Sequence, residues 1–527
     1  MWERGWRDRV WSDLNRRWDL IVIGGGITGA GILREASRAG LHALLVEEKD
    51  FASGTSSRSS KLVHGGLRYL KSGEIKLTVE SVRERERLLK EGRGLVGQLG
   101  FLLPNFAGDR PPAWVFGAGL IFYELLALKW GHRHYDAFDM RELSPNVREA
   151  GLLGGYRFFA AQTDDARLVL RVIREAVRGG GVAINYACVE SLLRSRSGQV
   201  CGVVLRDQAP GGEGRASEIG ASVVINATGA WADGLRRQRS GRRLRRLRGS
   251  HLIFSAKRFP LRRAVSFLHP KDRRPVFVLP WEGVTLFGTT DVDHDQPLDA
   301  EPAISAAEVE YLMAGLAYAF PSLELTLDDV QGTFAGVRPV VDTGKADPSK
   351  ESREHVLWIE DGLLTVIGGK LTTFRVMAHD ALEAVRAHLP GKPTFSRSQR
   401  MLDLQPADFD APGLDPATRL RLLGRYGADA PSLIDAAQGE LESIHESAAL
   451  WAELRWATRA EGVIHLDDLL LRRVRLGLLL PRGGLDCMDR IRAIAQPELG
   501  WSDDRWAQEV KRYADLWKRC YSLPGAG

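Results

Sequence analysis

The clearest alternation of apolar and polar positions lies near the start of the chain, at residues 18–50. Residues 19–23 form a short, β-branched apolar run bounded by glycine, which is typical of a buried parallel strand. Residues 27–38 follow a helical pattern that Gly40 ends, and residues 41–46 form a second apolar run. The pattern therefore predicts a strand, a helix and a second strand in succession.

Three glycines with G-x-G-x-x-G spacing join the first predicted strand to the helix: Gly24, Gly26 and Gly29. In such a turn the first glycine allows the tight bend, the second lets the backbone approach a pyrophosphate, and the third lets the helix pack closely on the strand. A pyrophosphate would bind the free N–H groups at the helix N-terminus. Glu47 ends the second strand, where an acidic side chain can accept hydrogen bonds from a ribose hydroxyl. No basic residue occupies this position to bind a 2′-phosphate, which argues against NADP. Together these features predict a dinucleotide site.

Strand patterns recur later in the chain. A strand at residues 221–231 ends in a small-residue turn. A strand at residues 363–367 leads into a second glycine turn at residues 368–375, which opens a helix that runs through Arg386. A block of strands at residues 251–254, 275–279 and 284–290 is typical of a mixed or antiparallel sheet.

Other stretches of the chain carry weaker patterns. Residues 101–147 are rich in aromatic residues and are interrupted by prolines, which predicts an insertion rather than a sheet. Residues 390–412 are polar and contain proline, as a domain boundary often does. The pattern beyond them is helical, including residues 443–460 and 466–480.

Length and composition fit a soluble globular protein. A chain of 527 residues is long for one core, so two or three domains are expected. The N-terminus has no signal-peptide pattern, and the apolar stretch at residues 113–128 is shorter than the ~20 residues that a membrane span needs. The four cysteines are far apart, which predicts a reducing cytoplasm and no metal site.

The net charge of +6 adds one feature, because much of the excess lies between residues 235 and 249. Eight arginines crowd this stretch: Arg236, Arg237, Arg239, Arg242, Arg243, Arg245, Arg246 and Arg248. They could attract an anionic lipid surface at ~1 kcal/mol each, or form a solvated loop. Nucleic acid is not expected, because no binding motif accompanies them. The tryptophan-rich residues 2–14 have an amphipathic helical pattern that suits either a membrane interface or packing on the protein's own sheet.

Residues 51–70, here called the hydroxyl-rich loop, combine serines, threonine, glycines and small residues. No packed element needs so many hydroxyl groups together, whereas such a loop can wrap a cofactor and offer it hydrogen-bond donors. His64 is followed by two glycines, which let another molecule approach closely. The loop is therefore predicted to contact the cofactor.

Eight motifs occur in an order that resembles the FAD-dependent glycerol-3-phosphate dehydrogenases. They read IGGGITGAG, SGTSSRSSKLVHGGLRYL, AQTDDARLV, NATGAWAD, GSHLIF, FGTTDVD, FAGVRPV and IGGKLTTFR. The resemblance extends from Asp19 to the C-terminus. HGGLRYL and GGKLTTFR are more specific to this family than the first glycine turn. The chain departs from the family pattern at Glu91–Val96, which is glycine-rich, and in the density of its arginine run.

The resemblance implies the fold class and the domains. The class is α/β: an FAD-binding Rossmann-like domain of the two-dinucleotide, D-amino-acid-oxidase-like type, with a β-sheet substrate cap and a C-terminal all-α domain. The FAD-binding domain is expected at residues 1–395, with the cap at roughly 75–150 and 250–340. The helical domain is expected at residues 396–527.

The resemblance also implies a reaction. The expected activity is oxidation of sn-glycerol 3-phosphate to dihydroxyacetone phosphate, with hydride transfer from C2 to the flavin N5 of FAD and electrons passed to a membrane quinone. A glycerol-3-phosphate oxidase that uses oxygen is the first alternative, and a non-catalytic flavin-binding, membrane-associated protein is the second. Peripheral attachment to the inner, cytoplasmic face of an anionic membrane is expected, and a homodimer is a further expectation.

The chemistry assigns roles to residues within these motifs. Oxidation of a secondary alcohol needs a base, and imidazole suits proton transfer near neutral pH, which indicates His64 or His251. A dianionic phosphate needs cations, and Arg338 is expected to serve both catalysis and binding. Further substrate contacts are predicted at Arg68, Tyr69 and Lys370. The predicted FAD contacts are Gly24, Gly26, Ile27, Thr28, Gly29, Glu47, Thr55, Ser56, Ser57, Ser59, Ser60, Lys61, His64, Gly65, Gly66, Ala227, Thr228, Gly229, Gly369, Lys370, Leu371 and Thr372.

Overall fold

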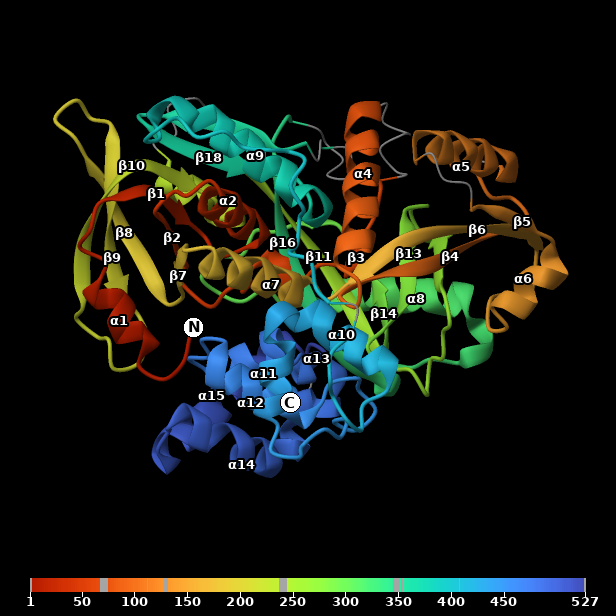
Figure 1. The fold of residues 1–527 in the computed structure, drawn as a ribbon. Coiled ribbons are helices and arrows are strands. Elements are labelled where there is room, and N and C mark those ends of the chain that lie inside the picture. Colours follow the sequence, from red (N-terminus) through yellow and green to blue (C-terminus); the bar gives the residue numbers. More distant parts are fainter. Residues whose placement is uncertain are drawn as a thin grey trace.

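A mostly parallel sheet forms one side of the molecule (Figure 1). The computed structural model describes residues 2–66, 74–110, 112–127, 131–236, 244–344, 351, 354–406 and 408–525. The strand order is β17-β18-β10-β1-β2-β7, in which β18, β10, β1, β2 and β7 pair in parallel. The hairpin of β8 and β9 extends β10. The bounds are β1 Trp18–Ile23, β2 Ala43–Val46, β7 Val182–Ile184, β8 Ala187–Arg194, β9 Val200–Asp207, β10 Ala216–Asn226, β17 Val356–Glu360 and β18 Leu363–Ile367.

Three helices pack around the centre of this sheet. Helix α2 (Ile27–Arg38) contacts both α7 (Asp165–Arg178) and α9 (Phe374–Val385). Residues 20–22 of β1 are fully buried, as the apolar run predicts for a parallel strand covered on both faces. The predicted succession of strand, helix and strand is confirmed in β1, α2 and β2.

A second, mixed sheet forms the cap on the other side of the molecule (Figure 1). Its order is β15-β11-β14-β13-β12-β4-β6-β3, with β16 paired to β11 and β5 paired to β6. The bounds are β3 Leu62–Val63, β4 Val96–Phe106, β5 Arg133–Tyr135, β6 Leu152–Thr163, β11 Leu244–Ser255, β12 Ala264–Leu268, β13 Pro275–Trp281, β14 Val284–Gly288, β15 Val292–Asp293 and β16 Val330–Val341. The helices of this part are α4 Ile75–Glu91, α5 Ala113–Ala127, α6 Ala137–Leu143 and α8 Ala306–Ala319.

The prediction that residues 101–147 form an insertion rather than a sheet is wrong at β4 and at β5, because both strands pair with β6 in the cap sheet. Phe101 and Leu102 lie in β4, buried between β6 and β12. Proline normally interrupts a sheet because it cannot donate a backbone hydrogen bond. Here β12 pairs with β4 at Phe101 and Leu102, before Pro104 is reached, so the missing N–H group breaks no pairing with β12. The cap sheet also includes β6, beyond residue 150.

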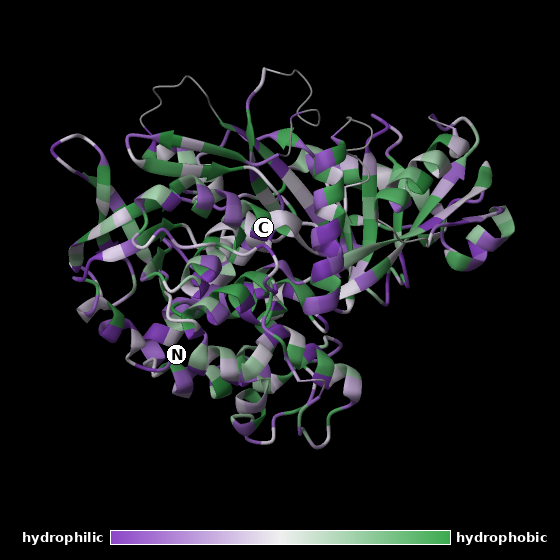
Figure 2. Cartoon of the chain, turned by 45° about the horizontal axis from the view of Figure 1, so that its top comes forward, coloured by the Kyte–Doolittle hydropathy of each residue, from purple (hydrophilic) through white to green (hydrophobic). Residues whose placement is uncertain are grey.

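The C-terminal helices cover one face of the cap sheet. They are α10 Pro416–Tyr426, α11 Ala430–Asp435, α12 Trp451–Ala460, α13 Leu476–Leu479, α14 Met488–Leu499 and α15 Asp503–Cys520, with a π-helical turn at Asp468–Arg473. Ile253 and Phe334 of the sheet share a core with Leu454 and Tyr513 of these helices. Leu252 faces the other side and packs in a core that includes residues of α8. In Figure 2 the strands are mainly green, whereas the charged helix α4 carries much purple.

The N-terminal tryptophans pack on the protein itself. Trp2, Trp6 and Trp11 are 4%, 6% and 9% exposed. Trp2 stacks on Phe51 with ring centroids 5.3 Å apart, and its Nε1 donates to the carbonyl of Ala183. Of the two interpretations of residues 2–14, packing on the protein's own sheet is therefore correct, because these side chains are not available to a membrane.

Candidate active site

The turn between β1 and α2 has the geometry that a pyrophosphate needs. Gly24 has φ +112°, and a Cβ there would lie 2.6 Å from the carbonyl oxygen of Ala227. A Cβ on Gly29 would lie 1.9 Å from the carbonyl oxygen of Gly24, so helix and turn approach too closely for any side chain. Gly26 precedes the first residue of α2, and the N–H of Ile27 donates to Ser56 Oγ at 3.0 Å. The N-terminus of a twelve-residue helix is thus directed at the hydroxyl-rich loop.

Glu47 closes the other side of this turn. Its Oε2 accepts a hydrogen bond from the N–H of Gly25 at 2.6 Å, and its Oε1 accepts one from the N–H of Lys49 at 2.9 Å. Burial raises the pKa of Glu47 to about 7, and the two backbone donors oppose that rise. Its contact with a ribose hydroxyl stays a prediction. Together with the two crowded glycines, Glu47 makes a cradle that fits a dinucleotide.

The described part of the hydroxyl-rich loop, residues 51–66, connects the two sheets. The hydroxyl of Thr55 donates to the carbonyl of Val337 in β16. A Cβ on Gly336 would lie 2.6 Å from the carbonyl oxygen of Arg58, so the loop crosses β16 at a position where only glycine fits. Ser57 is buried, and its hydroxyl lies 3.5 Å from the carbonyl of Gly54.

Two members of this loop are directed at a buried carboxylate. The hydroxyl of Ser59 donates to Asp165 Oδ2 at 2.7 Å, and Lys61 Nζ lies 2.9 Å from both carboxylate oxygens. Lys61 is fully buried, and burial lowers its pKa to about 8 although Asp165 opposes that shift. In this structure these two side chains thus fix the shape of the loop.

One candidate base, His251, lies on the same face of the cap sheet as Arg338. In the β11–β16 register, His251 is opposite Phe334, and Leu247 is opposite Arg338. Along each strand the two positions are four residues apart, so their side chains point to the same face of the sheet. Directly opposed residues share a face of the sheet. The imidazole of His251 stacks on Phe334 at 4.5 Å, and its Nε2 is 2.8 Å from Ser60 Oγ. Because Gly336 lies between these positions, the hydroxyl-rich loop passes between His251 and Arg338.

The ionisation of His251 is controlled by its surroundings. Burial lowers its pKa to about 3, and the positive charges of Lys61 and Arg338 add to this shift. His251 is therefore neutral near pH 7. His64 is partly exposed, and its carbonyl accepts a hydrogen bond of 3.4 Å from the hydroxyl of Thr372. The choice between the two histidines stays open.

The predicted cations belong to different elements. Arg338 NH2 donates to Asp291 Oδ1 at 2.8 Å, and 27% of its side chain is exposed. Lys370 is the residue before the 3₁₀ turn Leu371–Thr373 that leads into α9, and its Nζ donates to Ser81 Oγ of α4 at 2.8 Å. Arg68 and Tyr69 lie outside the described residues.

The remaining predicted FAD contacts lie at two further turns. The N–H of Ala227 donates to the carbonyl of Ile23, and the hydroxyl of Thr228 donates to Asn226 Oδ1 at 2.7 Å. Gly229 and Gly369 both have positive φ, as the predicted turns require. Thr28 and the glycines at positions 65 and 66 lie in α2 and in the hydroxyl-rich loop. Contact of these residues with a cofactor stays a prediction.

Sequence reasoning missed several residues that shape the site. Asp291 holds Arg338, Asp165 holds Lys61, and Arg475 of the C-terminal helices donates to the carbonyl of Ser57 at 2.8 Å. Asp165 belongs to the quoted AQTDDARLV motif. The signal for Arg475 was three arginines inside the apolar run LLLRRVRLGLLL, since buried arginines are rare without partners.

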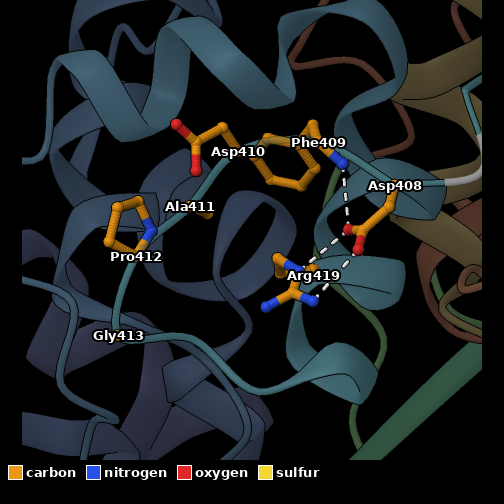
Figure 3. A pocket seen from close by; sticks show the side chains of 7 residues that line it. All are labelled: Asp408, Phe409, Asp410, Ala411, Pro412, Gly413 and Arg419. Atoms are coloured by element: carbon orange, nitrogen blue, oxygen red, sulfur yellow. Dashed lines mark hydrogen bonds and ion pairs between the residues drawn. The ribbon is translucent and has the colours of Figure 1, made fainter.

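A surface hollow of about 520 Å³ lies elsewhere, at the start of the helical part (Figure 3). Residues 408–413 and Arg419 line it, and none of them is a predicted site residue. The guanidinium of Arg419 is bound to both oxygens of Asp408, at 2.8 and 3.0 Å. Its charge is therefore already compensated.

Two family models match this chain. Residues 19–375 match the model described as FAD dependent oxidoreductase. Residues 368–506 match the model described as the C-terminal domain of alpha-glycerophosphate oxidase.

Similar proteins and structures agree with these models. Glycerol-3-phosphate dehydrogenase 2 of Mycobacterium tuberculosis (strain ATCC 25618 / H37Rv) is 35% identical over 530 residues, which cover 96% of this chain and 89% of the relative. Aerobic glycerol-3-phosphate dehydrogenase of Bacillus subtilis (strain 168) is 39% identical over 391 residues, which cover 73% and 69%. The crystal structure of the glycerol-3-phosphate dehydrogenase from Bacillus halodurans complexed with FAD matches with a TM-score of 0.79 at 29% identity, covering 99% of this chain and 98% of that one.

Proposed function

From the premise that this chain belongs to the FAD-dependent glycerol-3-phosphate dehydrogenases, we propose that it oxidises sn-glycerol 3-phosphate to dihydroxyacetone phosphate and passes the electrons to a membrane quinone. One observation supports the reaction most directly. An imidazole, His251, and a guanidinium, Arg338, lie on one face of the cap sheet beside a loop that reaches the N-terminus of α2. This arrangement offers a proton acceptor and a phosphate-binding cation next to a dinucleotide cradle.

FAD is the cofactor, and when bound it supplies the acceptor for the hydride that leaves C2. The residues that would hold it are the turn at Gly24–Gly29, the N-terminus of α2, and Glu47. Arg338 binds the phosphate of the substrate in this proposal. Asp291 Oδ1 accepts a hydrogen bond from Arg338 NH2 at 2.8 Å and so orients the guanidinium.

The proton of the C2 hydroxyl passes to an imidazole. His251 is neutral in the free protein and can accept a proton, while its stacking on Phe334 and its contact with Ser60 hold the ring in one orientation. Its pKa is low for a base at neutral pH. A dianionic phosphate bound at Arg338 would neutralise positive charge and raise that pKa. Substrate binding would therefore strengthen the base. His64 is the alternative proton acceptor.

Attachment to the membrane is supported by helix α5 rather than by the N-terminus. Trp114, Ile121, Phe122 and Leu125 are 71%, 43%, 43% and 51% exposed, and their spacing places them along one side of the helix. Exposed apolar side chains gathered in this way mark an interaction surface. Helix α5 lies at the outer end of the cap (Figure 1). Among the described residues no helix is long and apolar enough to cross a bilayer. We propose peripheral binding of α5 to the cytoplasmic face of the membrane.

The arginine run at residues 236–248 should attract an anionic membrane less strongly than its sequence indicates. Arg236 is buried and bound to Asp233 and Glu360, Arg245 is bound to Asp293, and Arg248 is bound to Glu308. Ion-paired arginines attract lipid headgroups weakly, since the net local charge is small. Residues 237–243 of the run lie outside the described residues.

The competing function is a glycerol-3-phosphate oxidase, because the matching C-terminal model takes its description from such an oxidase. The purified protein should be supplied with sn-glycerol 3-phosphate and either a soluble quinone analogue or oxygen. The proposal expects fast reduction of the quinone analogue and little peroxide. Stoichiometric peroxide with slow quinone reduction would favour the oxidase instead.

A further inference from the structure

Three buried arginines of the C-terminal part reach the start of the hydroxyl-rich loop. Arg472, Arg473 and Arg475 are 3%, 0% and 1% exposed, although they follow an apolar stretch of a helical region. A buried charge is retained only where partners compensate it. Some of their partners are local, since Arg472 also binds Asp467 and Asp468. The others lie in the dinucleotide half of the molecule, more than 300 residues away along the chain: Asp50, Ser57, Asp164 and Asp165.

Asp50, the residue before the hydroxyl-rich loop, is held by two of them. Arg473 contacts both carboxylate oxygens, at 2.6 and 2.8 Å, and Arg472 Nε donates to Oδ2 at 2.5 Å. Asn185 adds a hydrogen bond of 3.0 Å. The carboxylate of Asp50 is fully buried, and the two guanidinium groups lower its pKa against the effect of burial. The loop therefore starts from a fixed point.

Arg475 holds the loop next to the glycine turn. Its NH2 donates to the carbonyl of Ser57 at 2.8 Å and to Asp165 Oδ1 at 3.2 Å. Lys61 Nζ donates to the same carbonyl at 2.6 Å. The adjacent residue, Ser56, accepts the hydrogen bond from the first N–H of α2. The residue whose carbonyl Arg475 binds, Ser57, is therefore the direct neighbour of Ser56, which contacts the N-terminus of α2 where a pyrophosphate would bind.

The backbone of Arg475 supports a specific role for its side chain. Its φ is +62°, a left-handed conformation that few residues other than glycine adopt and that persists only where surrounding contacts fix it. Its NH1 group also donates to the carbonyl of Leu471 at 2.6 Å. The side chain is therefore held at both the helical region and the loop.

We propose that Arg475 is a positioning residue for FAD: it fixes the backbone at Ser57 and so presents the hydroxyl-rich loop to the cofactor. The C-terminal helical region then sets the affinity for FAD although the glycine turn belongs to the other half of the chain. Replacing Arg475 leaves neither neighbouring carboxylate without a cation. Asp165 still binds Lys61 at 2.9 Å, and Asp164 still binds Arg425 at 2.7 Å.

The test compares full-length Arg475→Met and Arg475→Lys with a matched control, Arg421→Met. Arg421 binds the buried Glu453 within the C-terminal helices and makes no hydrogen bond or ion pair with residues 51–66, the described part of the loop. For each apoprotein we would measure the dissociation constant for FAD, the melting temperature with and without FAD, and amide hydrogen exchange of a peptide that covers residues 50–61.

The proposal expects Arg475→Met to raise the dissociation constant for FAD about 10- to 100-fold, since a hydrogen bond from a charged group is lost. It also expects faster exchange in residues 50–61 of the apoprotein and a smaller rise of the melting temperature on adding FAD. Arg475→Lys keeps one donor and should fall between parent and Met variant.

A purely structural role predicts a different result. Arg475→Met would then behave like Arg421→Met, with equal losses of melting temperature with and without FAD, a dissociation constant within about twofold of the parent, and unchanged exchange in residues 50–61. That result overturns the proposal. If Arg475→Met does not fold, Arg475→Lys decides: parent-like affinity and exchange would overturn the proposal, and weaker affinity with faster local exchange would support it.

Discussion

Replacing Arg338 tests how the substrate phosphate is bound. The cap sheet should remain intact in Arg338→Ala. Asp291, which binds Arg338 in the parent, still forms an ion pair with Arg274 at 3.5 Å. A hydrogen bond to a charged group contributes about 1.5–3 kcal/mol, so kcat/KM for sn-glycerol 3-phosphate should fall roughly 10- to 150-fold. Arg338→Lys should recover part of the loss, since lysine supplies charge without the paired donors.

The assay is quinone-dye reduction with sn-glycerol 3-phosphate and, in parallel, with glycerol, which lacks the phosphate. Glycerol should be a poor substrate for the parent and should change much less in the variant. Arg245→Ala is the matched control, because Arg245 lies in the same sheet and binds Asp293. FAD content should equal that of the parent in both variants. Equal losses with both substrates in Arg338→Ala would refute the phosphate assignment.

Three further predictions concern other parts of the molecule. Burial raises the pKa of Glu47 from its usual 4.5 to about 7, so the apoprotein should lose stability as pH rises from about 4.5 to 7. The melting temperature of Glu47→Gln should lack this part of the pH dependence. The double variant Trp114→Ser, Phe122→Ser should bind anionic vesicles more weakly than the parent in a flotation assay, and unchanged binding would exclude α5 as the membrane surface. Ser60→Ala should lower kcat more than it raises KM, because the ring of His251 loses its anchor; a KM effect alone would contradict that role.

Local pattern predicted the centre of the fold because each signal lies within about thirty residues. Apolar runs and glycine spacing between residues 19 and 47 are sufficient to predict β1, α2 and β2. The cap required more, since β4 contains Pro104 and gains its burial from β6 and β12, which are remote in sequence. Strand pairing of this kind is not encoded in any short window.

The candidate site shows the same division. Motifs indicated His251 and Arg338, but their common face depends on the β11–β16 register. The bond from Arg475 to Ser57 joins residues 418 positions apart, and no local pattern reports such a contact. The buried N-terminal tryptophans show a similar limit, because an amphipathic helix has the same sequence pattern whether it faces lipid or its own protein.

Mixing the FAD-loaded protein with substrate in the absence of oxygen and quinone tests the central claim most directly. The account predicts that sn-glycerol 3-phosphate bleaches the visible absorption band of the oxidised flavin in a single turnover. One dihydroxyacetone phosphate should form per bound FAD. The enantiomer and glycerol should leave the spectrum nearly unchanged. An unchanged spectrum with sn-glycerol 3-phosphate, in protein that releases FAD on denaturation, would contradict the proposed reaction.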